Sequence, residues 1–259
     1  MQLKGLVALV TGAGNGIGKA ITEAYAREGA DLALVDIDPV SLGAVAKMAS
    51  DKGCNVTAIE ADLGDVASIN AMVDKALAHV GRIDVLVNNA GVTRKAFIMD
   101  ITEEDWDRIH RINAKGLFFA MQRVAREMME RDGGRIINMA SIAGKGFRDS
   151  SNVAYAGSKG AVIAMTRMTA LQLGSYGVRV NAICPGVTMT PLIESLIQQQ
   201  ADREGQTVAE VSEKFFKTIP LKIPNEPEDI AAMAVFLAGP GGRTITGQTY
   251  NIDGGLIPD

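Results

Sequence analysis

Two residues one helical turn apart, Tyr155 and Lys159, form the pair in this sequence best suited to proton transfer. A helix is expected to begin near Tyr155, and the spacing of four residues places both side chains on the same helix face. A phenol titrates near pH 10, whereas an ammonium about 4 Å away, at an effective dielectric of about 20, stabilises its anion by roughly 4 kcal/mol, or about three pKa units. The pair therefore predicts a general acid and base that works near neutral pH.

A glycine-rich turn follows the first expected strand and leads into a helix. Gly12, Gly16 and Gly18 form the pattern G-x-x-x-G-x-G, with Asn15 and Ile17 between them. Because Ile17 stands at the sixth position counted from Gly12, the strict G-x-G-x-x-G fingerprint is absent. Glycines between a strand and a helix let backbone N–H groups approach a pyrophosphate, so we expect a dinucleotide here, although such turns also have other uses.

The carboxylate of Asp36 indicates which dinucleotide is bound. Asp36 ends the second expected strand, where an acidic side chain can accept both hydroxyls of the adenosine ribose and repels a 2′-phosphate. Like charges about 4 Å apart cost on the order of 4 kcal/mol at an effective dielectric of about 20, and no arginine or lysine stands at Asn15 or Ile37 to offset this repulsion. The alternative role of a helix cap before Pro39 suits Asp38 better. We therefore expect NAD, with Asn15, Asp36 and Ile37 among its contacts.

Several motifs occur in the order and spacing typical of one enzyme family. They are Thr11 to Gly18, Asn88-Asn89-Ala90-Gly91, Asn113, Ser141, Tyr155-Ala-Gly-Ser-Lys159 and Pro185-Gly186. With them the whole chain resembles the short-chain dehydrogenase/reductase family. A lone tyrosine–lysine pair, serine or asparagine is usually an ordinary helix face, a turn or a surface residue, but coincidence of all of them in register is far less common.

The resemblance implies a role for each residue at the reacting end. Tyr155 is implied as the general acid and base, and Ser141 as the group that hydrogen-bonds the substrate oxygen. Asn113 is implied to hold a water that relays protons to Lys159. The run from Ser141 to Tyr155 is one residue longer than is commonest in the family, which implies an unusual pocket wall around residues 144–152.

The resemblance also implies further contacts between the chain and the dinucleotide, including the catalytic Tyr155 and Lys159. The other implied contacts are Asp62 and Leu63 at the adenine, Asn88, Ala90 and Gly91 beneath the ribose, and Pro185, Gly186, Thr188 and Thr190 around the nicotinamide and a phosphate. Each of these alone could be simple turn chemistry.

The elements that must position these residues alternate between strands and helices along the chain. Strands are expected near residues 6–10, 32–36, 56–60, 85–88, 135–139, 179–184 and 249–252, and helices are expected to begin near Ile17, Val40, Val66, Glu103, Tyr155 and Pro227. This rhythm predicts an α/β fold, a doubly wound Rossmann-type parallel sheet of about seven strands with helices on both faces. No spacer or repeat divides the chain, so we expect a single domain over residues 1–259, with an amphipathic excursion near 190–225 acting as a substrate lid.

Composition excludes several classes of function. A formal net charge of −4 without a basic run argues against nucleic acid, and no apolar segment is long enough to span a membrane, so a cytoplasmic location is expected. Two histidines and two cysteines, none at ligand spacing, predict no metal site.

The expected reaction is hydride transfer between NAD(H) and a secondary alcohol or its ketone. A polyol or sugar alcohol is the first expectation, because NAD favours oxidative catabolism and residues 247–255 look like those of polyol dehydrogenase relatives. The alternatives are a 3-oxoacyl-(acyl carrier protein) reductase or other carbonyl reductase, and an NAD-sensing protein without turnover. Candidate substrate contacts are Arg94, Phe97, Ala143, Phe147 and Asn152. Two long helices, over residues 103–131 and 155–174, favour a homotetramer, the state common among relatives.

Overall fold

A seven-stranded parallel sheet forms the centre of the molecule. The computed structural model describes residues 1–131 and 133–258; Asp132 and Asp259, which the expected domain also includes, lie outside the described part. The strands are β1 (Val7–Thr11), β2 (Asp31–Asp36), β3 (Val56–Glu60), β4 (Val85–Asn88), β5 (Gly134–Met139), β6 (Val178–Pro185) and β7 (Thr249–Ile252). Their spatial order is β3-β2-β1-β4-β5-β6-β7, and all pairs are parallel. The chain order reverses between β1 and β4, which makes this the switch point where ligands bind in such sheets.

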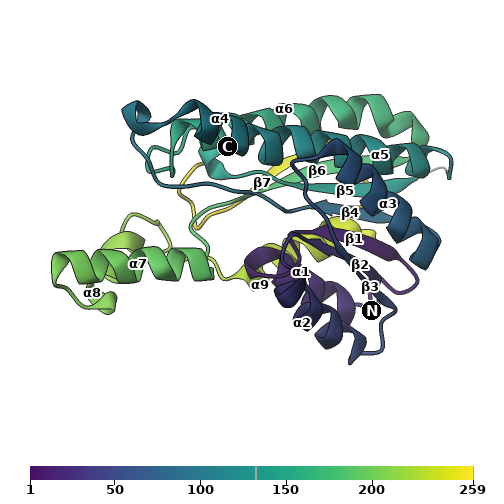
Figure 1. Cartoon of the computed structure of the whole chain (residues 1–259), viewed down its shortest axis with the longest axis horizontal. Helices are drawn as coiled ribbons and strands as arrows, with labels where there is room; N and C mark the ends of the chain where they lie inside the picture. The colour runs from purple at the N-terminus through teal and green to yellow at the C-terminus, as the bar shows by residue number, and fades with distance from the viewer. Residues whose placement is uncertain (132, 259) are drawn as a thin grey trace.

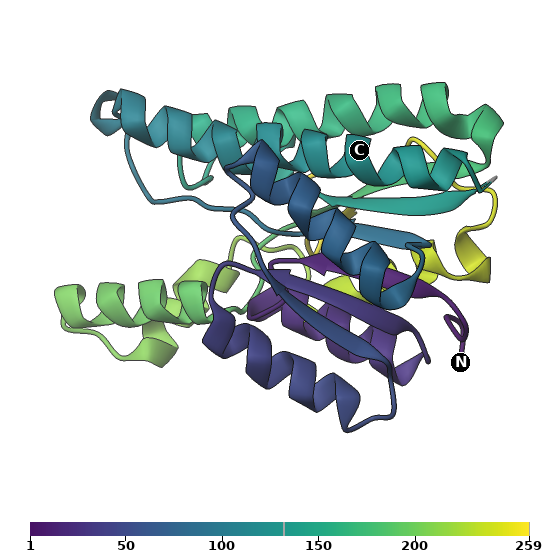
Figure 2. The same cartoon turned by 45° about the vertical axis from the view of Figure 1, so that its right-hand side comes forward.

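Helices cover both faces of the sheet, as Figures 1 and 2 show. One layer holds α1 (Gly16–Arg27), α2 (Pro39–Ser50) and α9 (Pro227–Ala238); the other holds α3 (Val66–Val80), α4 (Glu103–His110), α5 (Leu117–Met129) and α6 (Val153–Leu173). Short helical turns complete the layers: η1 (Ile98–Asp100), η2 (Arg111–Gly116), η3 (Ile142–Lys145), η4 (Gly174–Tyr176) and η5 (Pro240–Gly242). A separate apolar core fills the space on each side, so the central strands are buried on both faces and read as unbroken apolar runs. No helix in the described part is long and apolar enough to cross a membrane.

The doubly wound fold expected from the sequence is confirmed, and the strand boundaries agree to within one residue. One expected helix differs. Residues 103–131 were expected to form a single helix, whereas the chain passes from α4 through a π-helical turn, η2, into α5. The wider turn coincides with Asn113, whose buried side chain bonds to the backbone after β4, and π-turns of this kind are often found at functional sites.

The excursion after β6 forms two further helices, α7 (Pro191–Glu204) and α8 (Val208–Phe216). In both views they extend beyond the ends of the strands, away from the two helix layers (Figures 1 and 2). They carry a small apolar core of their own, built on Ile197, Ala201 and Val211. The function of this pair as a substrate lid stays a prediction.

Candidate active site

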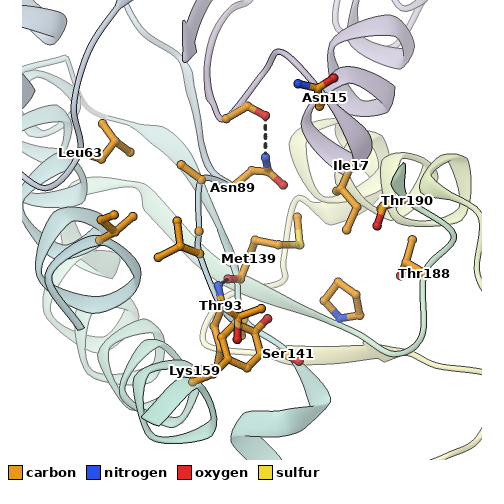
Figure 3. A pocket seen from close by; sticks show the side chains of 18 of the residues that line it. Asn15, Ile17, Leu63, Asn89, Thr93, Met139, Ser141, Lys159, Thr188 and Thr190 are labelled. Carbon is orange, nitrogen blue, oxygen red and sulfur yellow. Dashed lines mark hydrogen bonds between the residues drawn. The ribbon is translucent and has the colours of Figure 1, made fainter. Parts of the chain in front are cut away.

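A pocket of about 510 Å³ lies where the strands reach their carboxyl ends, across the switch point between β1 and β4. Its walls come from the segments that follow β1 to β6. In the close view Asn15, Ile17 and Thr190 lie at one end, while Ser141, Lys159 and Thr93 lie together at the other (Figure 3). The sequence-predicted residues that line it are Gly12, Asn15, Ile17, Asp36, Ile37, Asp62, Leu63, Ala90, Gly91, Ser141, Tyr155, Lys159, Pro185, Gly186, Thr188 and Thr190.

The start of α1 is open to an anion. Gly12 has a φ of +64°, and a Cβ there would stand 2.9 Å from the backbone of Ala90, so glycine lets the turn lie against the segment after β4. A Cβ on Gly18 would stand 1.9 Å from the Gly12 carbonyl oxygen, which makes glycine necessary for the helix to begin so close to the turn. Asn15 makes no capping hydrogen bond through its side chain, and the first turn of α1 carries no acidic residue. The residues present therefore fit a pyrophosphate at this helix N-terminus.

Asp36 holds its carboxylate at the far end of β2. One oxygen, Oδ2, accepts a hydrogen bond of 2.9 Å from the Gly14 N–H, and the other accepts one of 3.1 Å from the Asp38 N–H. Asp38 in turn caps α2 through the N–H groups of Val40 and Ser41, as the sequence predicts. Asp36 is thereby free of the capping role and faces the pocket, where Lys159 is the only cation among the described lining residues.

Tyr155, Ser141 and Lys159 meet at the reacting end. Tyr155 lies near the start of α6, where Asn152 caps the helix by accepting a 2.7 Å hydrogen bond from the Tyr155 N–H. Ser141 follows β5, and its Oγ accepts from the Ala143 N–H at 3.1 Å. Burial raises the pKa of the Tyr155 phenol, and a hydrogen bond with Ser141 acts in the opposite direction but does not outweigh it. The Lys159 Nζ lies 5.8 Å from the centre of the Tyr155 ring.

The Lys159 ammonium is itself perturbed by burial. Its side chain is 3% exposed, and desolvation lowers its pKa from 10.5 to about 8. The Nζ donates a 2.6 Å hydrogen bond to the Met139 carbonyl oxygen at the end of β5. From the sequence, Lys159 was expected to dominate the pKa of the phenol, and the burial of both groups was left out. In the structure, desolvation is the largest influence on the phenol and raises its pKa, so the neutral phenol is favoured.

Asn113 is a fully buried support of the site. Its Nδ2 donates to the Val92 carbonyl oxygen at 2.9 Å and to Ser158 Oγ at 3.2 Å, while its Oδ1 accepts from the Val92 N–H at 2.7 Å. A Cβ added to Gly91 would lie 3.2 Å from Asn113 Oδ1 and 3.5 Å from Lys159 Nζ. Asn113 thus fixes the segment after β4 beside Lys159. The implied water relay stays a prediction.

The segment after β6 presents polar groups to the pocket. Val187 and Met189 share backbone hydrogen bonds with Asn225, which leaves the peptide groups of Thr188 between them facing the other way. Thr190 stands at the start of α7 without making a capping hydrogen bond, and its methyl group would lie 3.4 Å from a Cβ on Gly16. Its hydroxyl therefore lies beside the open end of α1.

Four predicted site residues lie outside the pocket wall: Gly16, Gly18, Asn88 and Asn113. Gly16 and Gly18 shape the turn before α1, and Asn113 supports the pocket from outside through its hydrogen bonds to the Val92 backbone. Asn88 was expected to contribute its backbone beneath the ribose, which stays a prediction; its side chain is buried and donates to Asn138 Oδ1 on the neighbouring strand. Lining residues that the sequence reasoning missed are Ala61, Asn89, Val92, Thr93, Ile112, Met139, Ala140, Val187 and Ile193. Of these Asn89 had a signal, since it belongs to the Asn88–Gly91 motif. Its Nδ2 donates to the carbonyl oxygens of Thr11 and Gly12; the dashed line at Asn89 in Figure 3 marks one of these two bonds.

The substrate end has a polar wall built by hydrogen bonds between two loops. Thr93 lines the pocket, and its Oγ1 lies 2.6 Å from Ser151 Oγ and 3.3 Å from the Asn152 Nδ2 that donates to it. Arg94 instead forms an ion pair with Asp105 through two hydrogen bonds.

None of the five candidate substrate contacts lines the pocket. Arg94 is held by its ion pair, Phe97 is 69% exposed, and Asn152 is occupied as a helix cap. Ala143 is buried, and Phe147 packs against the apolar cluster that holds Ile142 of η3 and Val162 of α6.

A pocket that begins at the glycine-rich turn before α1 and ends at Tyr155, Ser141 and the buried Lys159 defines a nicotinamide-dependent oxidoreductase of the doubly wound α/β class. A family model described as enoyl-(acyl carrier protein) reductase matches residues 12–257. A solved short-chain type dehydrogenase/reductase from Mycobacterium marinum superposes with a TM-score of 0.90 at 32% identity, covering 100% of this chain and 98% of the other. The chain belongs to the short-chain dehydrogenase/reductase family.

Relatives within this family are described as acting on different substrates. The sorbitol dehydrogenase of Cereibacter sphaeroides is 42% identical over 98% of each chain. The 3-oxoacyl-[acyl-carrier-protein] reductase FabG of Thermotoga maritima is 38% identical over 99% of this chain and 100% of its own. A solved NAD⁺-bound xylitol dehydrogenase has a TM-score of 0.91 and 32% identity, over 98% of this chain and 100% of the other.

Proposed function

We propose that this protein oxidises a secondary alcohol of a polyol or sugar alcohol to the ketone, and reduces the ketone in the reverse direction, with NAD as the hydride carrier. The observation that carries the proposal is the meeting of Tyr155, Ser141 and Lys159 at one end of a pocket whose other end fits a dinucleotide. When bound, the nicotinamide supplies the acceptor for the hydride that leaves the alcohol carbon. The chain's own residues handle the proton.

The proton moves from the alcohol hydroxyl to the Tyr155 phenolate, and returns by the same route when a ketone is reduced. Ser141 already hydrogen-bonds Tyr155, so a ketone oxygen placed between them receives bonds from both hydroxyl groups, whereas an alcohol in the same place donates to the phenolate. The Lys159 ammonium stabilises negative charge on the phenolate, and the Met139 carbonyl oxygen orients it. Asn113 acts as a positioning residue, because it contacts Val92 and Ser158 rather than the pocket.

NAD rather than NADP is supported by the charges at the adenosine end. Asp36 and Asp62 both line this end, and the described lining offers no arginine and no lysine except Lys159. A 2′-phosphate beside Asp36 would meet a like charge without compensation. The solved xylitol dehydrogenase, which is described as NAD⁺-bound, agrees with this preference.

A polyol substrate is supported by relatives and by the wall of the pocket. The sorbitol and xylitol dehydrogenases among the similar proteins act on such alcohols by description, and the linked hydroxyls of Thr93 and Ser151 offer partners for hydroxyl groups next to the reacting carbon. Because one relative is described as a 3-oxoacyl reductase, the second candidate function is reduction of the 3-oxo group of an acyl thioester. A panel of sugar alcohols, diols, hydroxy acids and acyl thioesters, assayed with NAD and with NADP, distinguishes the two.

Tyr155→Phe tests the catalytic assignment. We expect turnover to fall by about 10²–10⁴ while NADH binding, followed by its fluorescence, stays within about twofold of wild type. Tyr176→Phe, which alters an exposed tyrosine in η4, is the matched control. Unchanged turnover in Tyr155→Phe would remove this residue as the acid and base. Saturable NADH binding without turnover of any compound in the panel would instead favour the NAD-sensing alternative.

We also propose that the protein assembles as a homotetramer. Exposed apolar side chains on α6, Met168 and Leu171, and the exposed Trp106 on α4 support burial of these helices against another copy. Light scattering at micromolar concentration tests the proposal, and a monomeric mass would refute it. The cytoplasmic location expected from the sequence stays a prediction.

A further inference from the structure

A second cavity, of about 570 Å³, lies at the opposite end of the sheet from the active site. It is placed at the amino ends of β4, β5 and β6, beside the ends of α5, α6 and α9. Arg135 marks its position at the start of β5, whereas Met139 at the end of the same strand lines the active site. Four residues of strand separate the two, about 13 Å along the sheet.

Five arginines and one aspartate dominate the described lining of this cavity. They are Arg82, Arg131, Arg135, Arg179, Arg243 and Asp84. The formal charges leave an excess of positive charge in a protein whose net charge is −4. Such a concentration of guanidinium groups around a hollow needs a compensating negative charge.

The carboxylate of Asp84 compensates only two of the arginines. Arg82 donates to it at 2.8 Å through both Nε and a terminal nitrogen, and Arg131 donates at 3.0 Å. Burial alone would raise the pKa of Asp84, but these bonds and one from the Val7 N–H lower it below its usual value. Asp84 is thus fully engaged as a carboxylate.

Arg179 is held by carbonyl groups. One of its terminal nitrogens donates to the carbonyl oxygen of Gly242 at 2.6 Å, as expected of a cation beside a helical C-terminus. The guanidinium groups of Arg135 and Arg243 make no hydrogen bond or ion pair with another residue among 1–131 and 133–258. Two cations of this cavity therefore remain without an anion in the described part of the chain.

The guanidinium groups of Arg135 and Arg179 also repel each other. They are register partners on the neighbouring parallel strands β5 and β6, so their side chains leave the same face of the sheet side by side. Like charges in this arrangement destabilise a sheet. Burial, and then the charge of Arg135, lower the pKa of Arg179. An anion bound between the two guanidinium groups would convert this repulsion into attraction.

We propose that the cavity at the amino ends of β4 to β6 is a second binding site, which takes a small polyanion carrying a phosphate group between Arg135, Arg179 and Arg243. Guanidinium groups suit this ligand because their planar fork donates two parallel hydrogen bonds to phosphate oxygens. The site is separate from the dinucleotide pocket, so its ligand and the cofactor bind together. Gly174, which also lines it, has open space where a Cβ would stand, so the ligand can approach the backbone there.

Titration calorimetry with pyrophosphate tests the site, carried out at constant ionic strength with and without saturating NADH. Because the start of α1 also fits a pyrophosphate, two sites can be filled without NADH, and we expect one of them to persist when NADH fills the dinucleotide pocket. Arg135→Gln and Arg243→Gln should each weaken pyrophosphate binding at least about tenfold. Arg27→Gln, an exposed arginine in the last turn of α1, is the matched control and should bind like wild type. Loss of the site in NADH, or equal affinity in all variants, would overturn the proposal.

Thermal unfolding tests the site independently of the binding measurement. A variant that failed to fold could not show the expected increase in unfolding temperature. In the absence of added anion, Arg135→Gln should unfold at a higher temperature than wild type, because the variant removes the repulsion with Arg179. Pyrophosphate should raise the unfolding temperature of wild type but not of Arg135→Gln. A lower unfolding temperature for the variant without anion would contradict the argument.

Two further ligands define the chemistry. Glucose 6-phosphate and pyrophosphate distinguish an esterified from a free phosphate, and binding of either supports the site. Citrate carries similar charge on carboxylates, so tighter binding of citrate than of both phosphates would refute the assignment to phosphate.

Discussion

Lys159→Met should make the protein without cofactor more stable at neutral pH while it destroys activity. The pKa of Lys159 falls from 10.5 to about 8, and each pKa unit corresponds to about 1.4 kcal/mol, so the folded state carries its ammonium at a cost of about 3 kcal/mol at pH 7. Methionine has a similar length and removes that cost, but it also loses the hydrogen bond to Met139, worth about 1 kcal/mol. The expected net gain is about 2 kcal/mol.

The stability gained by Lys159→Met decreases as the pH rises. Because the folded pKa lies below the unfolded one, the unfolded chain binds more protons between pH 8 and 10.5, and wild-type stability rises across this interval. The advantage of Lys159→Met is therefore full below pH 8 and disappears by about pH 10.5.

Differential scanning calorimetry without cofactor measures this advantage. At pH 7 the variant should unfold about 4–8 °C above wild type, and turnover should be lost. Lys4→Met, an exposed lysine far from the pocket, controls for the loss of a surface charge. Equal unfolding temperatures at pH 7, or a difference that persists unchanged at pH 10.5, would refute the claim that burial of the ammonium strains the folded state.

Three other substitutions test the remaining parts of the site. Asp36→Ser should raise kcat/KM with NADP relative to NAD by up to about a thousandfold, since it removes a repulsion of about 4 kcal/mol; an unchanged ratio in steady-state assays would contradict the charge argument. Asn113→Ala should lower the free energy of unfolding by about 2–4 kcal/mol in urea, because two backbone groups of Val92 lose their partners, and should reduce kcat more than NADH affinity. Thr93→Val should raise KM for a polyol about tenfold in initial-rate measurements with little effect on kcat, and no effect on KM would remove Thr93 from the substrate wall.

Local patterns were enough to predict the fold. The central strands β1 and β4 are buried on both faces and appear in the sequence as short, nearly unbroken apolar runs. The edge strands β3 and β7 are only partly buried and alternate apolar with polar residues. The π-helical turn η2 could not be predicted, because its cause is a contact between Asn113 and Val92, residues that lie 21 positions apart. The periodicity of apolar residues along a helix does not report a contact of this kind.

In the candidate site too, the sequence predicts the residues that follow strands but not the contacts between distant loops. Residues that follow strands, such as Asp36 and Ser141, could be assigned from the sequence because parallel strands bring their carboxyl ends to one edge. Contacts fixed by tertiary structure could not. Arg94 was expected in the substrate pocket, but its partner Asp105 comes from α4, and the Thr93–Ser151 hydrogen bond joins loops 58 residues apart.

The α7–α8 pair has a small apolar core of its own, built on Ile197, Ala201 and Val211. It is tied to the rest of the chain at its base, where Thr188 and Asn225 form a β-bridge and the Leu221 N–H donates to the Gly254 carbonyl oxygen. We expect such a pair to be exchangeable as a unit, because its own core is separate from the two cores that pack on the sheet. Residues 191–224 could then be traded between relatives to alter which alcohols are accepted, while the global unfolding temperature hardly changes. We therefore expect substrate specificity to change through this segment while the stability of the sheet and its two helix layers is kept.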